Sequence, residues 1–320
     1  MNEFEIIKKY LRPLSFKNAG ALKLSDDIYF DNKKKIALSI DTFVEKIHFL
    51  DSSNPKNFLK KILRSSLSDL YCKGISPKTY FLSLGLNKKF TNHKWLNEFK
   101  KILNLEQKKF SISLGGGDTT FSPKLIITIV VVGDVVKKPI FRKGCSLNDD
   151  IYVTNTIGDP FIGLNILKKK MNFGRLNNYF IMKYYEPEIP YKVLPILNKF
   201  ASSSIDISDG LGRDIKHLVI NSNFGALIDL NTLPVSAPCK RLLNKKKFKI
   251  NNIFSNGDDY QTVFTTKSNN REKILNLSKI CKIKVSKIGI VTKEKNITFK
   301  YNDRIFNLDS RKLGYIHNFK

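Results

Sequence analysis

The chain has 320 residues, of which 42% are hydrophobic, and this is enough apolar material to bury one large core or two ordinary ones. No apolar stretch reaches the roughly 18 residues that a membrane-spanning helix needs, and the N-terminus lacks the features of a signal peptide. The net charge of +28 is compatible with nucleic-acid binding, but the lysines occur in short runs mixed with Asn and Ile, which is typical of a solvated basic surface.

The first half of the chain alternates between helical and strand-like apolar patterns. Periodicity of the helical kind predicts helices over 3–12, 56–73 and 92–106. Apolar runs and period-two alternation predict strands near 36–41, 79–86, 109–114 and 125–134.

The second half repeats this alternation. The expected helices cover 159–169, 175–184, 190–201, 210–221 and 271–280. The expected strands cover 151–154, 224–230, 260–266 and 283–291. The polar stretch 137–149, with its Pro and Gly, separates the two halves and predicts domains at 1–137 and 149–320. Helices alternating with strands indicate the α/β or α+β fold class.

The four cysteines are scattered along the chain without a CxxC pair, at Cys72, Cys145, Cys239 and Cys281. This spacing argues against a zinc site and against a disulfide framework. It fits a protein of the reducing cytoplasm, without a membrane partner.

Acidic residues are few, but many of them fall in short segments with small residues. Asp26 and Asp27 are adjacent, and adjacent carboxylates are stable when they are solvated or when a cation neutralises them. Asp41 follows Ser39 at the end of a predicted strand, where α/β sheets place ligand contacts.

Two further segments combine acid with unusual surroundings. Asp69 lies in the predicted helix 56–73 near its apolar face, where either a metal or a salt bridge would offset the cost of burial. Asp118 follows three consecutive glycines, 115–117, and precedes two threonines. Such a glycine-rich turn lets the backbone approach an anionic ligand, although it lacks the lysine of a Walker motif.

The remaining acidic segments lie in the second half. Alternation places Asp206 and Ser208 on one side of a strand end, and Asp209 follows at a position that predicts a helix N-cap. Asp258 and Asp259 stand between Gly257 and another strand. So many carboxylates indicate more than one Mg²⁺ ion, bridged by the phosphate oxygens of a nucleotide.

These segments resemble the thiamine-monophosphate kinase family, within the superfamily of aminoimidazole-ribonucleotide synthetase and selenophosphate synthetase. The matching stretches are SDDIYF, LSIDTFVEKIHF, SLSDLYCKGISP, LGGGDTTFSP, SSIDISDGLGRD and SNGDDYQTVFT, and they follow the family's order. The resemblance covers essentially the whole chain. It implies a two-domain fold like that of aminoimidazole-ribonucleotide synthetase, with an N-terminal mixed sheet and a C-terminal α/β domain. It also implies a homodimer that is paired through N-terminal domains which bind ATP and Mg²⁺.

The resemblance further implies ATP-dependent phosphorylation of thiamine monophosphate and assigns roles to individual residues. The implied Mg²⁺ ligands are Asp27, Ser39, Asp41, Asp69, Asp118, Asp206 and Asp209. The implied ATP contacts are Gly117, Asp118, Arg142 and Ser208. The implied substrate contacts are His48, Asp258 and Tyr315, and the residues expected to act in catalysis are Asp118, Arg142 and Asp206.

The chain departs from the family pattern at three places. Leu24-Ser25 replaces a usual Gly, Ile40 replaces a usual Thr, and Asp258 replaces a usual Glu. Because Ile40 carries no hydroxyl, the metal set near Asp41 could differ from that of the family.

Other functions stay open on these residues. Another ATP-dependent synthetase or ATPase of the same superfamily would share the motifs, although the reactive Cys of selenophosphate synthetases has no counterpart near this N-terminus. A basic nucleic-acid-binding protein would interleave aromatic and basic residues, and the best such run, 183–186, holds a single lysine beside an acid.

Overall fold

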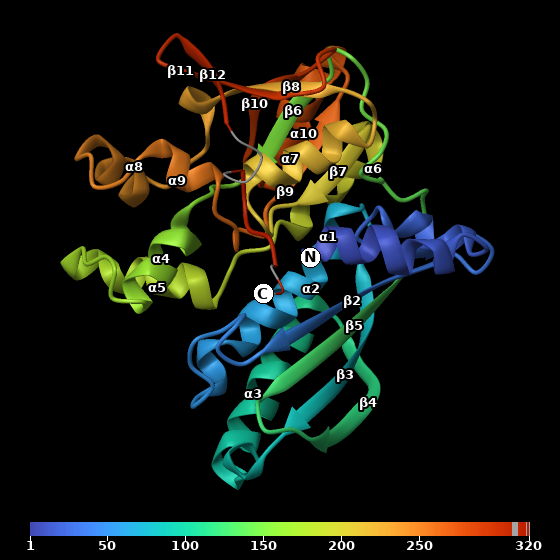
Figure 1. Ribbon diagram of the computed structural model, residues 1–320, viewed down its shortest axis with the longest axis vertical. Helices are drawn as coiled ribbons and strands as arrows, with labels where there is room; N and C mark the ends of the chain where they lie inside the picture. Colours follow the sequence, from blue (N-terminus) through green and yellow to red (C-terminus); the bar gives the residue numbers. More distant parts are fainter. Residues whose placement is uncertain (309–312, 318, 320) are drawn as a thin grey trace.

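The computed structural model describes residues 1–308, 313–317 and 319, and it contains two β-sheets with helices packed on them (Figure 1). The first sheet has the spatial order β1 (Tyr29–Asp31), β2 (Ile36–Val44), β5 (Ile126–Asp134), β3 (Pro77–Leu86), β4 (Ser113–Phe121). The β3–β4 pair is parallel and the other pairs are antiparallel, so the sheet is mixed. This arrangement confirms the predicted fold class.

The second sheet is built from the second half of the chain. Its order is β12 (Arg304–Asn307), β11 (Ile297–Tyr301), β8 (Gly225–Asp229), β10 (Val285–Thr292), β6 (Asp150–Thr154), β9 (Thr262–Thr266), β7 (Ser203–Asp206). The helices of this half are α4 (Asp159–Leu167), α5 (Asn177–Tyr185), α6 (Leu194–Phe200), α7 (Leu211–Ile220), α8 (Ala237–Asn244), α9 (Ile250–Phe254) and α10 (Arg271–Cys281). Across the described residues, every helix is too short or too polar to cross a membrane.

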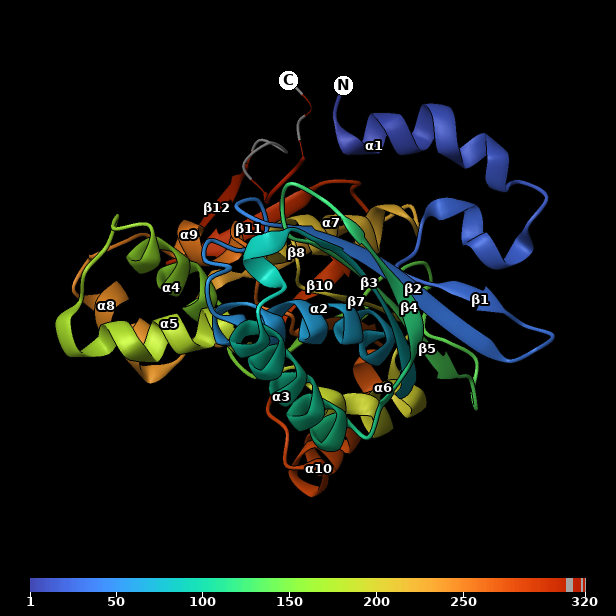
Figure 2. The ribbon, with the colours of Figure 1, turned by 90° about the horizontal axis from the view of Figure 1, so that it is seen from below.

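Helix α2 (Leu59–Cys72) lies between the two sheets and is buried along almost its whole length. It packs against β2 and β5 of the first sheet and against β7 of the second. Its apolar residues, among them Ile62, Leu63 and Leu67, are fully buried, and α3 (His93–Phe110) lies beside it on the same face of the sheet (Figure 2). Polar side chains on α2 therefore reach both halves of the protein.

The opposite face of the first sheet carries exposed apolar side chains. Along β5, alternate residues such as Ile127 and Ile129 are buried beneath α2 and α3, and the residues between them point to the other face. On that face Ile40 is 64% exposed, and at the edge of the sheet Phe121 of β4 is 79% exposed. We call this outward surface of β2, β5, β3 and β4 the open face.

One local prediction is confirmed with a change of helix type, and another is wrong. The helix expected over 3–12 is present, as an α-helix over α1 (Glu3–Ile6) that continues as a π-helix over Ile7–Leu11. The strand expected near 109–114 and the glycine turn after it are instead the end of α3 and the strand β4. A Cβ on Gly117 would lie 1.8 Å from the carbonyl oxygen of Leu82, so this glycine is needed for close strand pairing rather than for a turn.

Candidate active site

A cavity of about 760 Å³ lies where α2 and β2 of the first half meet the end of β7 and the loop before β9. Four of the predicted metal ligands line it: Asp41, Asp69, Asp206 and Asp209. The predicted substrate contacts His48, Asp258 and Tyr315 and the predicted ATP contact Ser208 line the same cavity. The structure therefore brings together, in one cavity, acidic and polar side chains from five separate stretches of the chain.

The carboxylates converge because each comes from a different element that ends or passes at this point. Asp41 is in register with the buried Ile129 and so points toward α2, which carries Asp69. Asp206 ends β7 and accepts a hydrogen bond from Ser68 Oγ at 2.7 Å. One oxygen each of Asp27 and Asp206, together with the sulfur of Cys72, lie within 4.8 Å of one another.

Burial makes these negative charges costly. Burial raises the pKa of Asp206 to about 7, and the nearby Asp27 adds to the rise. Burial likewise raises the pKa of Asp209 to about 6 and raises that of Asp69 well above its ordinary value, in the second case with help from Asp41 and Asp206. Positive charge in the cavity would remove this cost.

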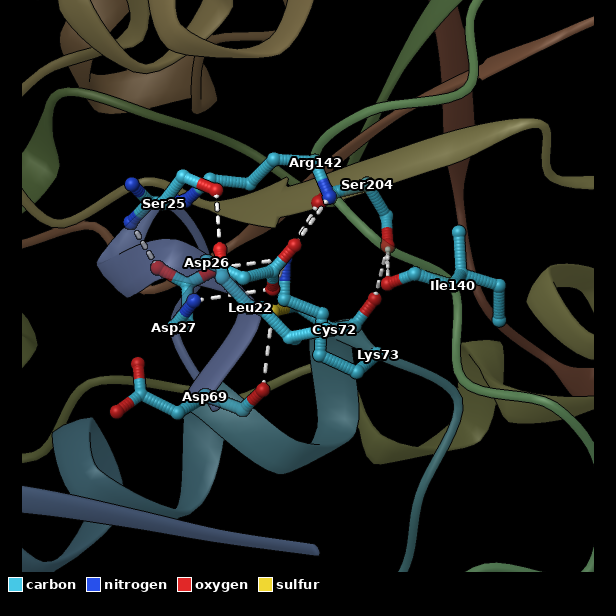
Figure 3. A network of polar contacts seen from close by, with 10 residues as sticks. All are labelled: Leu22, Ser25, Asp26, Asp27, Asp69, Cys72, Lys73, Ile140, Arg142 and Ser204. Carbon is cyan, nitrogen blue, oxygen red and sulfur yellow. Dashed lines mark hydrogen bonds and ion pairs between the residues drawn. The ribbon is translucent and has the colours of Figure 1, made fainter. Parts of the chain in front are cut away.

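Asp26 and Asp27 lie behind this cavity, between two cationic side chains (Figure 3). The guanidinium of Arg142 pairs with Asp27, and the backbone N–H of Arg142 donates to Asp26 at 2.7 Å. The ammonium of Lys73 lies 2.6 Å from Asp27 and 3.1 Å from Asp26. Burial alone would raise the pKa of Asp27, but Arg142 and Lys73 outweigh burial and hold that pKa well below its usual value.

Two observations test whether a divalent cation fits among these residues. Asp27 Oδ2 is buried and accepts no aligned hydrogen bond, even though Lys73 is close. Asp209 lines the cavity and does not cap α7, because the N-cap of that helix is Gly210. Carboxylate oxygens are the hard donors that Mg²⁺ prefers, so the donor set fits the ion. The prediction that Asp209 is the N-cap is wrong.

The predicted substrate contacts form a second group at the side of the cavity. His48 accepts a hydrogen bond from the N–H of Val44 through Nδ1 at 3.0 Å, and burial together with His317 lowers the pKa of His48. Asp258 is held at 2.9 Å by Lys61 and at 2.9 Å by the hydroxyl of Tyr260. This group offers a neutral imidazole and a fixed carboxylate to a ligand.

Besides Asp27 and Arg142, three more of the predicted residues do not line the cavity of their own chain. Asp118 pairs with Ser83 of β3, which pairs with Thr128 of β5, which in turn pairs with Thr42 of β2. Because residues in register point to the same face of a sheet, the side chain of Asp118 lies on the open face. Asp41 points to the other face and lies three strands away, roughly 14 Å from Asp118 across the sheet. Gly117 lies on the same edge strand, and Ser39 is buried behind the cavity beside the carbonyl oxygen of Ser66.

The structure also shows where the side chain of Ile40, which replaces a usual Thr, lies. It reveals residues that the sequence analysis missed as well. The side chain of Ile40 lies on the open face and not among the carboxylates, so its lost hydroxyl does not concern the buried cluster. Lys61, Cys72 and Lys73 were not predicted. The available signal was the presence of Lys61 and the C-cap Lys73 on a helix whose other buried side chains are mostly apolar or small.

Comparison with known proteins defines first the class and then the family. Residues 17–135, which form the first sheet with α2 and α3, match the model of the N-terminal domain of AIR synthase related proteins, and this gives the class. The thiamine-monophosphate kinase of Buchnera aphidicola subsp. Schizaphis graminum is 34% identical over 326 residues, covering 99% of this chain and 98% of that protein. The chain belongs to the thiamine-monophosphate kinase family.

Solved structures agree with this assignment. The thiamine monophosphate kinase of Aquifex aeolicus superposes with a TM-score of 0.81 at 25% identity, covering 96% of this chain and 98% of that one. A structure described as AaThiL complexed with AMPPCP and TMP superposes with a TM-score of 0.79 at 24% identity, covering 95% and 94%. The fold expected from the resemblance is thereby confirmed.

Proposed function

We propose that this protein transfers the γ-phosphoryl group of ATP to thiamine monophosphate and so forms thiamine diphosphate and ADP. The observation that carries the proposal is the shared cavity. Asp41, Asp69 and Asp206, suited to hold metal-bound phosphates, face the same space as His48 and Asp258. Family membership supports the same reaction, because the relatives are named for it.

We propose Mg²⁺ as the metal, held by Asp27, Ser39, Asp41, Asp69, Asp118, Asp206 and Asp209. Bound Mg²⁺ neutralises charge on phosphate oxygens as the phosphoryl group moves. The raised pKa values of Asp206 and Asp209, which a bound cation would reverse, support this assignment. For the nucleotide, Gly117, Asp118, Arg142 and Ser208 are the proposed contacts.

The transfer we propose is direct and in line. The acceptor is a phosphate monoester, which already carries negative charge at neutral pH, so its oxygen attacks without a general base. The guanidinium of Arg142 pairs with Asp27, and its positive charge beside the carboxylate cluster would offset the negative charge on the transferred phosphoryl group.

We propose that the active form is a homodimer joined through the open face. Exposed apolar side chains such as Ile40 and Phe121 favour burial against a second copy of the sheet. Asp118 lies on this face and cannot reach the carboxylates of its own chain across the sheet. A second copy would then supply Asp118 and Gly117 to the nucleotide.

The proposed domains are residues 1–137, which bind ATP and Mg²⁺ and dimerise, and residues 149–320, which complete the site. The division of the strands between two sheets supports this boundary. We also propose a cytoplasmic location. Free cysteines, three of them buried, support a reducing environment.

The test is transfer of label from [γ-³²P]ATP to thiamine monophosphate by the purified protein. We expect labelled thiamine diphosphate, with little phosphate released to water. A filter-binding assay with DNA and RNA in physiological salt tests the basic alternative, for which we expect only weak, salt-sensitive binding. Tight nucleic-acid binding without labelled thiamine diphosphate would overturn the proposal.

A further inference from the structure

Lys73 places a fully buried positive charge at the base of the carboxylate cluster. It is the C-cap residue of α2, and its side chain is 0% exposed. Buried lysines are rare, because removing an ammonium from water is costly unless oxygens surround it. The groups around the ammonium of Lys73 therefore indicate its role.

The ammonium is surrounded by oxygens in the way that a bound metal ion would be. Its Nζ lies 3.1 Å from Asp26 Oδ1 and 2.6 Å from Asp27 Oδ2, and it donates to the carbonyl oxygen of Ser204 at 2.7 Å (Figure 3). Asp26 and Asp27 come from the first half of the chain and Ser204 from β7. These three oxygens hold a cation at the junction of the two sheets.

The position matters because the same Asp27 faces the proposed metal ligands. Asp27 and Asp206 have oxygens within 4.8 Å of each other, and Asp69 lines the same cavity as Asp206. A positive charge fixed on Asp27 offsets the repulsion among these carboxylates when no divalent ion is present. The same charge repels a divalent ion that enters.

We propose that Lys73 is a built-in cation of the metal centre, which lets the carboxylate cluster fold without Mg²⁺ and weakens the binding of Mg²⁺. The proposal rests on the proposed function, because it takes Asp27 and Asp206 as metal ligands. The competing account is that Lys73 only ties the Asp26–Asp27 turn to β7. The two accounts differ in whether the effect of Lys73 depends on the metal.

The experiment compares the wild type with one variant, each with and without a divalent metal ion. The melting temperature of the wild type and of Lys73→Met is measured without divalent ions and over a Mg²⁺ series, and Mn²⁺ binding is measured by electron paramagnetic resonance. We expect Lys73→Met to melt lower without metal, to gain more from Mg²⁺ than the wild type, and to bind Mn²⁺ on the order of tenfold more tightly. Lys73→Arg keeps the charge, and we expect it to resemble the wild type.

Equal gains from Mg²⁺ in wild type and Lys73→Met, with equal Mn²⁺ affinity, would overturn the proposal and leave Lys73 as a tie. If Lys73→Met does not fold, Asp26→Asn is compared with Asp26→Asn/Lys73→Met, in which Asp27 keeps Arg142 as a partner. The same larger gain is expected in the double variant, and an equal gain overturns the proposal. If neither Mg²⁺ nor Mn²⁺ has an effect on the wild type or on any variant, the result would instead contradict the metal centre itself.

Discussion

Asp206 shows how a single side chain joins the two halves of the site. It ends β7, is 3% exposed, and accepts the hydroxyl hydrogen of Ser68 from α2. A buried carboxylate near Asp27 and Asp69 is unfavourable in the folded protein alone and becomes favourable when a cation binds. The charge of Asp206 therefore favours the binding of a cation more than it stabilises the fold.

We expect Asp206→Asn to lower the rate of thiamine diphosphate formation by orders of magnitude while the protein stays folded. The amide keeps the shape and the contact to Ser68 but lacks the charge that a metal needs. The assay is product formation at saturating Mg²⁺, with circular dichroism as the check on folding. Asp303→Asn, at a side chain that is 95% exposed, is the matched control. Near-normal turnover by folded Asp206→Asn would remove Asp206 from the metal centre.

The pKa of Asp206 also predicts a pH dependence. Its folded pKa of about 7 lies above the ordinary value of an aspartate, so the folded state holds the proton more tightly. Stability from this group is complete below the unfolded pKa and is lost as the pH rises through the folded pKa. Asn cannot ionise. In metal-free buffer, we therefore expect the melting temperature of Asp206→Asn, relative to wild type, to rise between pH 4 and pH 8. A constant difference across this range would contradict the assignment.

At the scale of elements, β4 shows why three glycines stand before Asp118. The strand pairs in parallel with β3, and the register shifts between Tyr80 and Phe81. Gly116 has φ of +149°, and Gly117 packs directly on the backbone of Leu82. The glycines let an edge strand bend and pack closely, and this fixes where Asp118 stands on the open face.

We expect Gly117→Ala to destabilise the protein by roughly 2–4 kcal/mol, because the added Cβ would meet the carbonyl oxygen of Leu82. Urea unfolding followed by fluorescence measures the change. Thr120→Ala, an exposed change on the same strand, should shift the midpoint little. If the two variants unfold at the same urea concentration, the close pairing of β3 and β4 is wrong.

Periodicity predicted most elements because buried faces repeat at 3.6 or 2 residues along α2, α3 and β5. It failed at β4, where an exposed edge strand rich in glycine has no apolar alternation to detect. In the candidate site, the motifs predicted eight residues that line the cavity, but Asp118 and Gly117 lie on the open face instead. The motifs could not predict the buried position of Lys73, because it depends on a contact with Ser204, which is 131 residues away in the sequence.

For the whole molecule, the decisive feature is that one predicted ligand, Asp118, lies on the open face. If a second copy supplies it, two inactive variants should complement each other. We expect Asp118→Asn mixed with Asp206→Asn, after dissociation and reassociation, to recover about a quarter of the wild-type activity per total site, because half of the chains form mixed dimers with one intact site each. Each variant alone serves as the control. No recovery in verified mixed dimers would place Asp118 in the site of its own chain.

The open face itself makes a separate prediction. Ile40→Asp puts a charge on the apolar part of the open face, and we expect it to turn a dimer into a monomer without unfolding the chain. Light scattering coupled to gel filtration gives the mass of each species. Ile280→Asp, at an exposed apolar residue of α10, is the control and should leave the mass unchanged. A wild-type monomer at assay concentrations would contradict the dimer.

The most direct test of the account is the rate of ADP release by the wild-type protein with and without thiamine monophosphate, over a Mg²⁺ series, with thiamine diphosphate quantified in the same samples. The account predicts that ADP release requires both Mg²⁺ and thiamine monophosphate, and that one thiamine diphosphate forms for each ADP. ADP release that is independent of thiamine monophosphate, or that proceeds without thiamine diphosphate, would contradict it.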